Sequence, residues 1–235
     1  LYVIGARSAS GKRLFILSGQ WLCLKNDTAA GHQDDNMHTA QDIITTYSRT
    51  GTRLREGFFK ARASLVQQAA LHMARSLARD GRIFILGEGA ADSCARTVAR
   101  AFLDRLDLDR PALPAFLIPA GDLREQGEDR AALRQLEALA RAGDTLLSFL
   151  PDPAQTTMGP VLALAQETGL SCIALCGRPA AGLSLPGLVI DVPDASGAPA
   201  FLVHELLFAA GHLVCRLVDH YLFENVTAIQ AVDPQ

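Results

Sequence analysis

The sequence predicts an α/β protein, a doubly wound domain built on a parallel sheet of five strands. Two observations predict it: short uninterrupted apolar runs, and amphipathic helical patterns that separate them. Uninterrupted apolar strands are typical of parallel sheets whose two faces are both covered by crossover helices. The expected strands are 82–86, 113–118, 145–150, 171–175 and 188–192, and the expected helices are 92–104, 129–142, 156–168 and 199–224.

A long helical segment precedes the first strand. Its apolar residues recur at steps of three and four, which places them on one side of a helix. They are Leu54, Phe58, Ala61, Leu65, Ala69, Met73 and Leu77. Gly51 is expected to separate a short first helix from the long second one, and Gly81 to end this N-terminal helical pair. The apolar stripe must pack on the core or on another subunit.

Four segments are expected along the chain. Residues 1–36 differ in composition from the rest, and we interpret them as an extension that is not part of the natural chain, which then begins at Met37. Residues 37–81 form the N-terminal oligomerisation helices, 82–226 the α/β domain and 227–235 a tail. Within the extension, a phosphate-loop interpretation fails because five residues, not four, separate Gly5 from Gly11.

Composition excludes several classes of protein. With 235 residues, 49% of them hydrophobic and 20% charged, the chain can bury one sizeable core. A net charge of -3 without a Lys/Arg run makes nucleic acid an unexpected direct ligand. No uncharged apolar run reaches about 18 residues, so no membrane span is expected. The five cysteines, without a signal peptide, are expected to be reduced thiols in a cytoplasmic protein.

The turns that follow the strands are the expected place for a ligand. In open parallel sheets, ligands bind at the carboxyl ends of strands where the strand order reverses. Gly87, Glu88 and Gly89 follow the first strand and open a helix, so their N–H groups could receive an anion. The same glycines also fit a tight turn without a ligand. Glu88 places a carboxylate where a phosphate would have to sit.

Several motifs carry a family resemblance. The segment Gly87-Glu-Gly-Ala-Ala-Asp-Ser-Cys-Ala95 resembles the Gly-Asn-Gly-Gly-Ser-x-x-Asp-Ala turn of phosphoheptose isomerases and of their replication-initiator-associating relatives. Further similar segments are 135–139, 142–147, 169–177 and 211–223. The resemblance runs from about Thr39 to Phe223. It implies the sugar-isomerase (SIS) fold, which is flavodoxin-like, a sugar-phosphate ligand and a homotetramer assembled through the N-terminal helices.

The family's phosphate loop is degraded in this chain. The resemblance places the Ser-Thr-Ser-Gly-Asn-Ser loop on residues 150–155, where every hydroxyl is missing. Pro151 and Pro153 remove two N–H donors, and Asp152 adds a negative charge, so we expect the loop to repel a phosphate dianion. Thr156 and Thr157 follow directly. Each is expected to cap the next helix or to offer a hydrogen-bond donor.

The family's metal and acid–base cluster is also incomplete. The resemblance places its His and Glu, four residues apart on one helix, at Thr97 and Ala101, which can neither bind zinc nor move a proton. Its Gln and His on the last helix fall on His204 and His212. The resemblance thus implies His212 as a catalytic candidate and both histidines as metal candidates. They lie about two turns and 80° apart, so a third ligand such as Glu205 or Cys94 is needed. We expect no cofactor, with zinc retained only as what the resemblance implies.

Three functions are compatible with these residues. The favoured one is an SIS-domain protein of the phosphoheptose isomerase type that binds a carbohydrate derivative or a protein partner without the family's catalysis. The alternatives are an active sugar-phosphate aldose–ketose isomerase and a regulatory protein that associates with the replication initiator. A changed specificity, in which Glu88 and Asp152 bind a cationic ligand, is also open. A homo-oligomer is expected in each case.

Overall fold

The computed structural model describes residues 5–7, 13–17, 20–23, 39–118, 129–180, 184–193, 195 and 197–230. The chain divides into two compact units, 1–39 and 40–235. The first unit contains three short antiparallel strands in the order β1-β2-β3: β1 (Gly5–Arg7), β2 (Arg13–Leu17) and β3 (Gln20–Cys23). Met37, the predicted start of the natural chain, lies outside the described residues.

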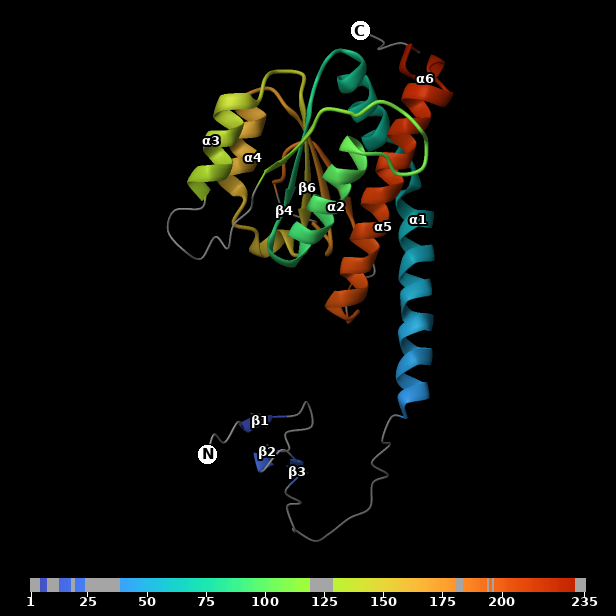
Figure 1. Ribbon diagram of the computed structural model, residues 1–235, viewed down its shortest axis with the longest axis vertical. Helices are drawn as coiled ribbons and strands as arrows, with labels where there is room; N and C mark the ends of the chain where they lie inside the picture. The colour runs from blue at the N-terminus through green and yellow to red at the C-terminus, as the bar shows by residue number, and fades with distance from the viewer. Residues whose placement is uncertain are drawn as a thin grey trace. The chain divides into compact units, whose positions relative to one another are not determined.

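The second unit is built on a five-stranded parallel sheet (Figure 1). Its strands are β4 (Ile83–Gly87), β5 (Ala115–Ile118), β6 (Thr145–Leu150), β7 (Ser171–Cys176) and β8 (Leu188–Asp191). They lie in the order β5-β4-β6-β7-β8, and every neighbouring pair is parallel. The predicted fold class is therefore confirmed. Because β5 and β6 flank β4 on opposite sides, the strand order reverses between β4 and β6.

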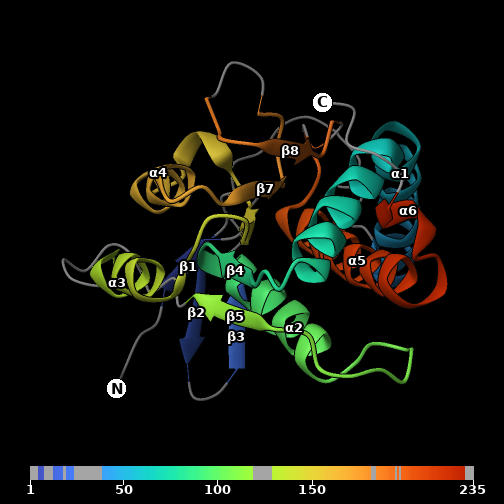
Figure 2. The ribbon, with the colours of Figure 1, turned by 90° about the horizontal axis from the view of Figure 1, so that it is seen from above.

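Helices cover both faces of this sheet (Figure 2). On one face lie α1 (Ala40–Ala78), α2 (Asp92–Leu103) and α5 (Ala200–Asp219); on the other lie α3 (Asp129–Leu139) and α4 (Gly159–Glu167). Alternate residues of one strand enter the two cores: Ile83 and Ile85 face one, Phe84 and Leu86 the other. All four are fully buried, which explains the uninterrupted apolar run that predicted the strand.

The N-terminal helical pair is a wrong prediction, because α1 is one continuous helix of 39 residues that passes through Gly51. A single glycine weakens a helix by only about 1 kcal/mol and leaves its hydrogen-bond ladder intact. Packing of α1 along α5 offsets that cost: Leu54 is 5% and Phe58 1% exposed, and Gly51 faces Leu202. The helix ends where Asp80 adopts φ 61° and Gly81 N–H donates to the Ser76 carbonyl.

The substitution Gly51→Ala tests the continuous helix. We expect it to raise the free energy of unfolding by about 0.5–1 kcal/mol, because alanine favours a helix interior. The added Cβ would lie 3.4 Å from the Leu202 side chain, an ordinary contact distance. Urea unfolding of the variant measures the change. A helix that broke at Gly51 would need the freedom of glycine there, and alanine would then destabilise the protein.

The C-terminal part of the chain begins with α5, which continues into a π-helical turn, η3 (His220–Glu224), and is followed by α6 (Thr227–Gln230). By length and composition, Ala200–Glu224 could cross a membrane, but half of its most apolar window is buried inside this unit. It packs on α1 and α2, as a core helix of a globular protein does.

A buried ion pair joins the ends of α2 and α5. Arg110, with a side chain 1% exposed, donates from Nε to Asp219 Oδ1 at 2.7 Å, and the Asp219 side chain is fully buried. The other guanidinium nitrogens donate to the carbonyl groups of Ala101, Phe102 and Pro111. Burial raises the pKa of Asp219, against the lowering effect of the Arg110 guanidinium. The pair closes the C-terminal end of α2 against α5.

Candidate functional site

The turn after β4 needs its glycines for packing. A Cβ at Gly87 would lie 2.3 Å from the Ala91 carbonyl oxygen, because the short helix η1 (Gly89–Ala91) folds back on the end of the strand. Gly89 has φ 55°, in the left-handed region that favours glycine. Both glycines are thus explained by a tight turn without any ligand. The turn nevertheless lies at the point where the strand order reverses, beside the end of β6.

Glu88 projects from this turn and binds the loop after β6. Its Oε1 accepts hydrogen bonds from the backbone N–H of Thr157 at 2.8 Å and from the Thr157 hydroxyl at 2.9 Å. Its backbone N–H donates to the Phe149 carbonyl at 3.0 Å. The carboxylate of Glu88 therefore occupies both donors that Thr157 could offer to an anionic ligand ahead of α4. This contact joins residues 69 positions apart, and no local sequence pattern indicates it.

The loop after β6 folds on itself through Asp152. Its Oδ1 accepts the Ala154 N–H at 3.2 Å, and its Oδ2 accepts from Gln155 Nε2 at 3.1 Å, so Asp152 caps the short helix η2 (Pro153–Gln155). Arg178 Nε lies 3.6 Å from Asp152 Oδ2. The carboxylate of Asp152, which was predicted to lie in this loop, thus has hydrogen-bond donors within the loop and one guanidinium group, that of Arg178, beside it.

The helix expected from Thr156 begins three residues later, as α4 at Gly159. Thr156 is extended, with φ -65° and ψ 136°, and its Oγ1 accepts the Met158 N–H at 3.1 Å. Pro160 then stands in the first turn of the helix, where a missing N–H costs nothing. Thr156 therefore caps the segment that enters α4, whereas Thr157 donates its hydrogen bonds to Glu88.

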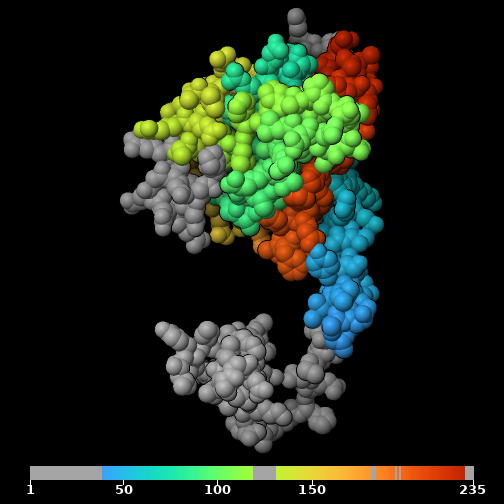
Figure 3. Space-filling model, in the orientation of Figure 1, coloured from blue at the N-terminus to red at the C-terminus, as the bar shows by residue number. Residues whose placement is uncertain are grey.

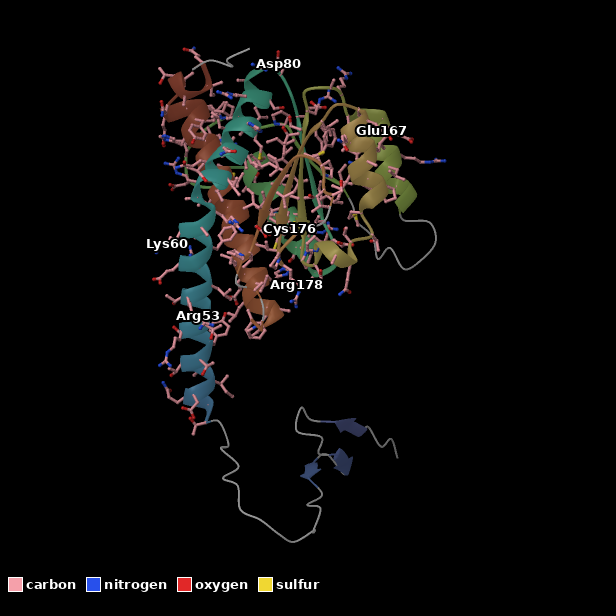
Figure 4. All side chains as sticks on the ribbon, turned by 180° about the vertical axis from the view of Figure 1, so that it is seen from behind. Arg53, Lys60, Asp80, Glu167, Cys176 and Arg178 are labelled. Carbon is pink, nitrogen blue, oxygen red and sulfur yellow. The ribbon has the colours of Figure 1, made fainter. Side chains whose placement is uncertain are left out.

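A small cavity of about 190 Å³ lies beside these loops. Its polar side chains are Asp152, Arg178 and His204, and its remaining walls come from the ends of β6 and β7 and from the first turns of α5. Figure 4 labels Arg178 just beyond the end of β7, next to Cys176. Sequence reasoning missed Arg178. The available signal was its position two residues after Cys176, in one of the turns already expected to hold a ligand.

His204 contacts the first core helix. Its Nε2 lies 3.1 Å from Ser93 Oγ and 3.3 Å from Cys94 Sγ. Burial raises the pKa of the Cys94 thiol to about 11, so the group is a neutral thiol at pH 7 and a poor nucleophile or metal ligand. The structure thus brings Cys94 to His204, as considered from the sequence. Glu205, the other candidate third ligand, does not join them, because its carboxylate accepts a hydrogen bond from the Tyr47 hydroxyl of α1.

His212 lies further along α5 in an apolar setting. Its ring packs edge-on against Phe208, with centroids 4.4 Å apart, and burial lowers the pKa of its imidazole. The ring is therefore neutral at pH 7 and available to accept a proton. The structure gives it a different set of neighbours from His204, which contacts Ser93 and Cys94 on α2.

The side chains at the metal positions do not fit zinc. Thr97 donates its hydroxyl to the Ser93 carbonyl at 3.0 Å, and Ala101 presents a buried methyl group. Among the described residues, no group of three or more His, Cys, Asp or Glu side chains is placed to hold an ion. A tetrahedral zinc site needs three or four such ligands. The residues at these positions therefore do not provide a zinc ligand set.

These features define the class: a doubly wound α/β domain with a small cavity at the carboxyl ends of β6 and β7. A family model described as SIS domain matches residues 46–177. The chain belongs to the SIS domain family, and within it to the phosphoheptose isomerase type.

Relatives and solved structures agree with this assignment. The chain is 35% identical to a phosphoheptose isomerase of Desulfovibrio desulfuricans over 198 residues, which cover 81% of this chain and 93% of the relative. It is 32% identical to that of Nitratidesulfovibrio vulgaris (strain Miyazaki F) over 197 residues, covering 81% and 94%. The fold matches a phosphoheptose isomerase structure from Francisella tularensis with a TM-score of 0.68 at 22% identity, covering 77% and 99% of the two chains.

Proposed function

We propose that this chain binds an uncharged carbohydrate derivative and does not catalyse the isomerisation of a sugar phosphate. One observation carries the proposal: Glu88 Oε1 accepts both the N–H and the hydroxyl hydrogen bonds of Thr157. A carboxylate bound at this position opposes a phosphate dianion by like-charge repulsion and by occupying its donors. Asp152 adds a second negative charge in the loop after β6, with Arg178 as its partner.

The side chains near the site also argue against the family's catalysis. Interconversion of an aldose and a ketose needs a base beside the two carbon atoms that exchange the carbonyl group. Neither Thr97 nor Ala101 can accept that proton. His212 keeps a neutral imidazole, and its described ring contact is with Phe208. The loss of the imidazole and carboxylate at positions 97 and 101 supports binding better than turnover.

The geometry favours a neutral ligand over a cationic one. For an amine to bind, Glu88 and Asp152 would have to turn their carboxylates toward a common point. Instead, Glu88 is held by Thr157, and Asp152 by Ala154, Gln155 and Arg178. The cavity offers an aspartate, an arginine and a histidine, which together can accept and donate hydrogen bonds to hydroxyl groups. The hydroxyl groups of a sugar can both donate and accept hydrogen bonds, so they match these acceptors and donors without adding a net charge.

Thermal-shift measurements test the proposal with the full chain. Unphosphorylated heptoses and hexoses at millimolar concentration are expected to raise the melting temperature, because a ligand that binds only the folded state stabilises it. Sedoheptulose 7-phosphate at the same concentration is expected to cause no shift. Stabilisation by the phosphate ester, without stabilisation by the free sugars, would contradict the proposal and support an active isomerase. The 35% identity to a phosphoheptose isomerase favours that second candidate.

We further propose that the protein is a cytoplasmic homotetramer assembled through α1. Figure 3 shows the first turns of α1 extending beyond the body of the second unit. There Ile43 and Ile44 are each 61% exposed, and Tyr47 stacks on Phe201, itself 56% exposed. These apolar side chains supply a surface for another copy of the helix. The buried free thiols Cys94, Cys172, Cys176 and Cys215 support a reducing compartment. Sedimentation at micromolar concentration is expected to give a tetramer; a monomer would contradict this assembly.

A further inference from the structure

A second cavity, of about 510 Å³, lies at the amino ends of β4, β6 and β7. Its walls are the last turns of α1, the turn that leads into β4, the turn that leads into β6 and the first residue of β7. Figure 4 shows this arrangement: Asp80 lies at this end of the sheet, while Cys176 and Arg178 lie at the other. The cavity is within the size range of small-molecule sites and is separate from the candidate carbohydrate site.

The lining of this cavity is positively charged in a chain whose net charge is -3. Four arginines line it against two aspartates, which leaves two formal positive charges, and His72 stands beside them. The arginines are Arg75, Arg79, Arg82 and Arg141, and the aspartates are Asp80 and Asp144. The dipole of α1 accounts for a basic residue in its last turn, Arg75. It does not account for Arg82 and Arg141, which lie outside the helices.

The buried aspartate holds the backbone of the cavity and does not pair with the arginine side chains. Asp144 is 4% exposed, and its two oxygens accept the backbone N–H groups of Arg82 and Arg141, each at 2.8 Å. The Arg82 guanidinium donates to the Leu139 carbonyl at 3.0 Å. Over the described ranges, the guanidinium groups of Arg79 and Arg141 have neither a carboxylate nor a carbonyl partner. Two charged donors therefore remain for a ligand.

The backbone around these arginines is fixed before any ligand binds. Ser76 Oγ donates to the Gly143 carbonyl at 2.6 Å, which ties the end of α1 to the turn before β6. Asp80, with φ 61°, is the one residue other than glycine with a positive φ among those described, and it closes the turn between α1 and β4. Because the backbone of these turns is already held, binding has to order only the arginine side chains, which favours binding.

We propose that this cavity binds a small phosphate-bearing anion. The planar guanidinium group donates two parallel hydrogen bonds that match the oxygens of a phosphate, and two unpaired arginines on facing turns can hold two phosphate groups. The site lies at the end of the sheet opposite to the carbohydrate site. It is thus a second ligand site, independent of whether the proposed function is right.

Calorimetric titration of the full chain with pyrophosphate tests this proposal. The unchanged protein is expected to bind it, and Arg79→Gln and Arg141→Gln are each expected to weaken binding about tenfold, because each removes a charge-assisted hydrogen bond. Asp80→Asn is expected to tighten binding several-fold: it removes a like charge, and asparagine also tolerates a positive φ. Arg134→Gln, on the exposed face of α3, is the matched control and is expected to leave binding unchanged.

Melting temperatures of the free variants, matching that of the unchanged protein, verify that each substitution leaves the fold intact. The proposal is overturned if pyrophosphate does not bind. It is also overturned if folded Arg79→Gln and Arg141→Gln bind it as tightly as Arg134→Gln does, because the ligand is then held elsewhere on the protein.

Discussion

Asp219→Asn is expected to lower the free energy of unfolding by about 3–5 kcal/mol, the typical cost of leaving one member of a buried ion pair without its partner. Both side chains of the Arg110–Asp219 pair are at most 1% exposed. In the variant, the Arg110 guanidinium would keep its carbonyl partners but would remain a buried charge without a counter-charge. Urea unfolding followed by circular dichroism measures the change.

The control for this experiment is an aspartate of the same neighbourhood in a solvated ion pair. Asp107, 81% exposed, lies 3.9 Å from Arg216 Nε. Asp107→Asn is expected to change the free energy of unfolding by less than about 1 kcal/mol, as exposed ion pairs contribute little. Equal effects of the two substitutions would show that the burial of Arg110 and Asp219 is not what makes their pairing important.

Glu88→Gln has the largest expected effect on ligand binding. We expect it to raise the affinity for sedoheptulose 7-phosphate by at least about tenfold. Two unit charges 4 Å apart interact by about 4 kcal/mol at an effective dielectric constant of 20, so removing one carboxylate removes a large repulsion. Glutamine can still accept from Thr157, which preserves the loop. Asp152→Ser in the same chain is expected to raise the affinity further, since it removes the second negative charge.

Titration calorimetry with the phosphate ester measures this gain, and Glu137→Gln, on exposed α3, serves as the charge-matched control. If Glu88→Gln binds the ester no better than Glu137→Gln does, then Glu88 is not what excludes phosphate. The placement of the phosphate loop on residues 150–155 would then be in doubt as well.

The sheet could be predicted from sequence because each strand carries its own signal. An apolar run such as that of residues 83–86 identifies a strand buried on both faces without reference to any other part of the chain. The break at Gly51 was predicted wrongly for a related reason. Local propensity favours a break there, but packing of Leu54 and Phe58 against the body of the domain overrides it.

The candidate site could be predicted only in part. The ends of the strands indicated the positions of Glu88 and Asp152, and the family resemblance placed His204 near the site. The partners of these groups come from distant parts of the chain: Glu88 binds Thr157, His204 contacts Ser93, and Asp152 pairs with Arg178. Such pairings depend on the register of strands and on loop paths, which leave no periodic pattern in a single sequence.

Incubation of the unchanged chain with sedoheptulose 7-phosphate, followed by NMR analysis of the sugar, tests the central claim most directly. The phosphoheptose isomerase of Desulfovibrio desulfuricans serves as the positive control. Our account predicts no isomer above the level formed without protein. Formation of an isomer by this chain, and its loss in the His212→Ala variant, would contradict the account and establish an active isomerase.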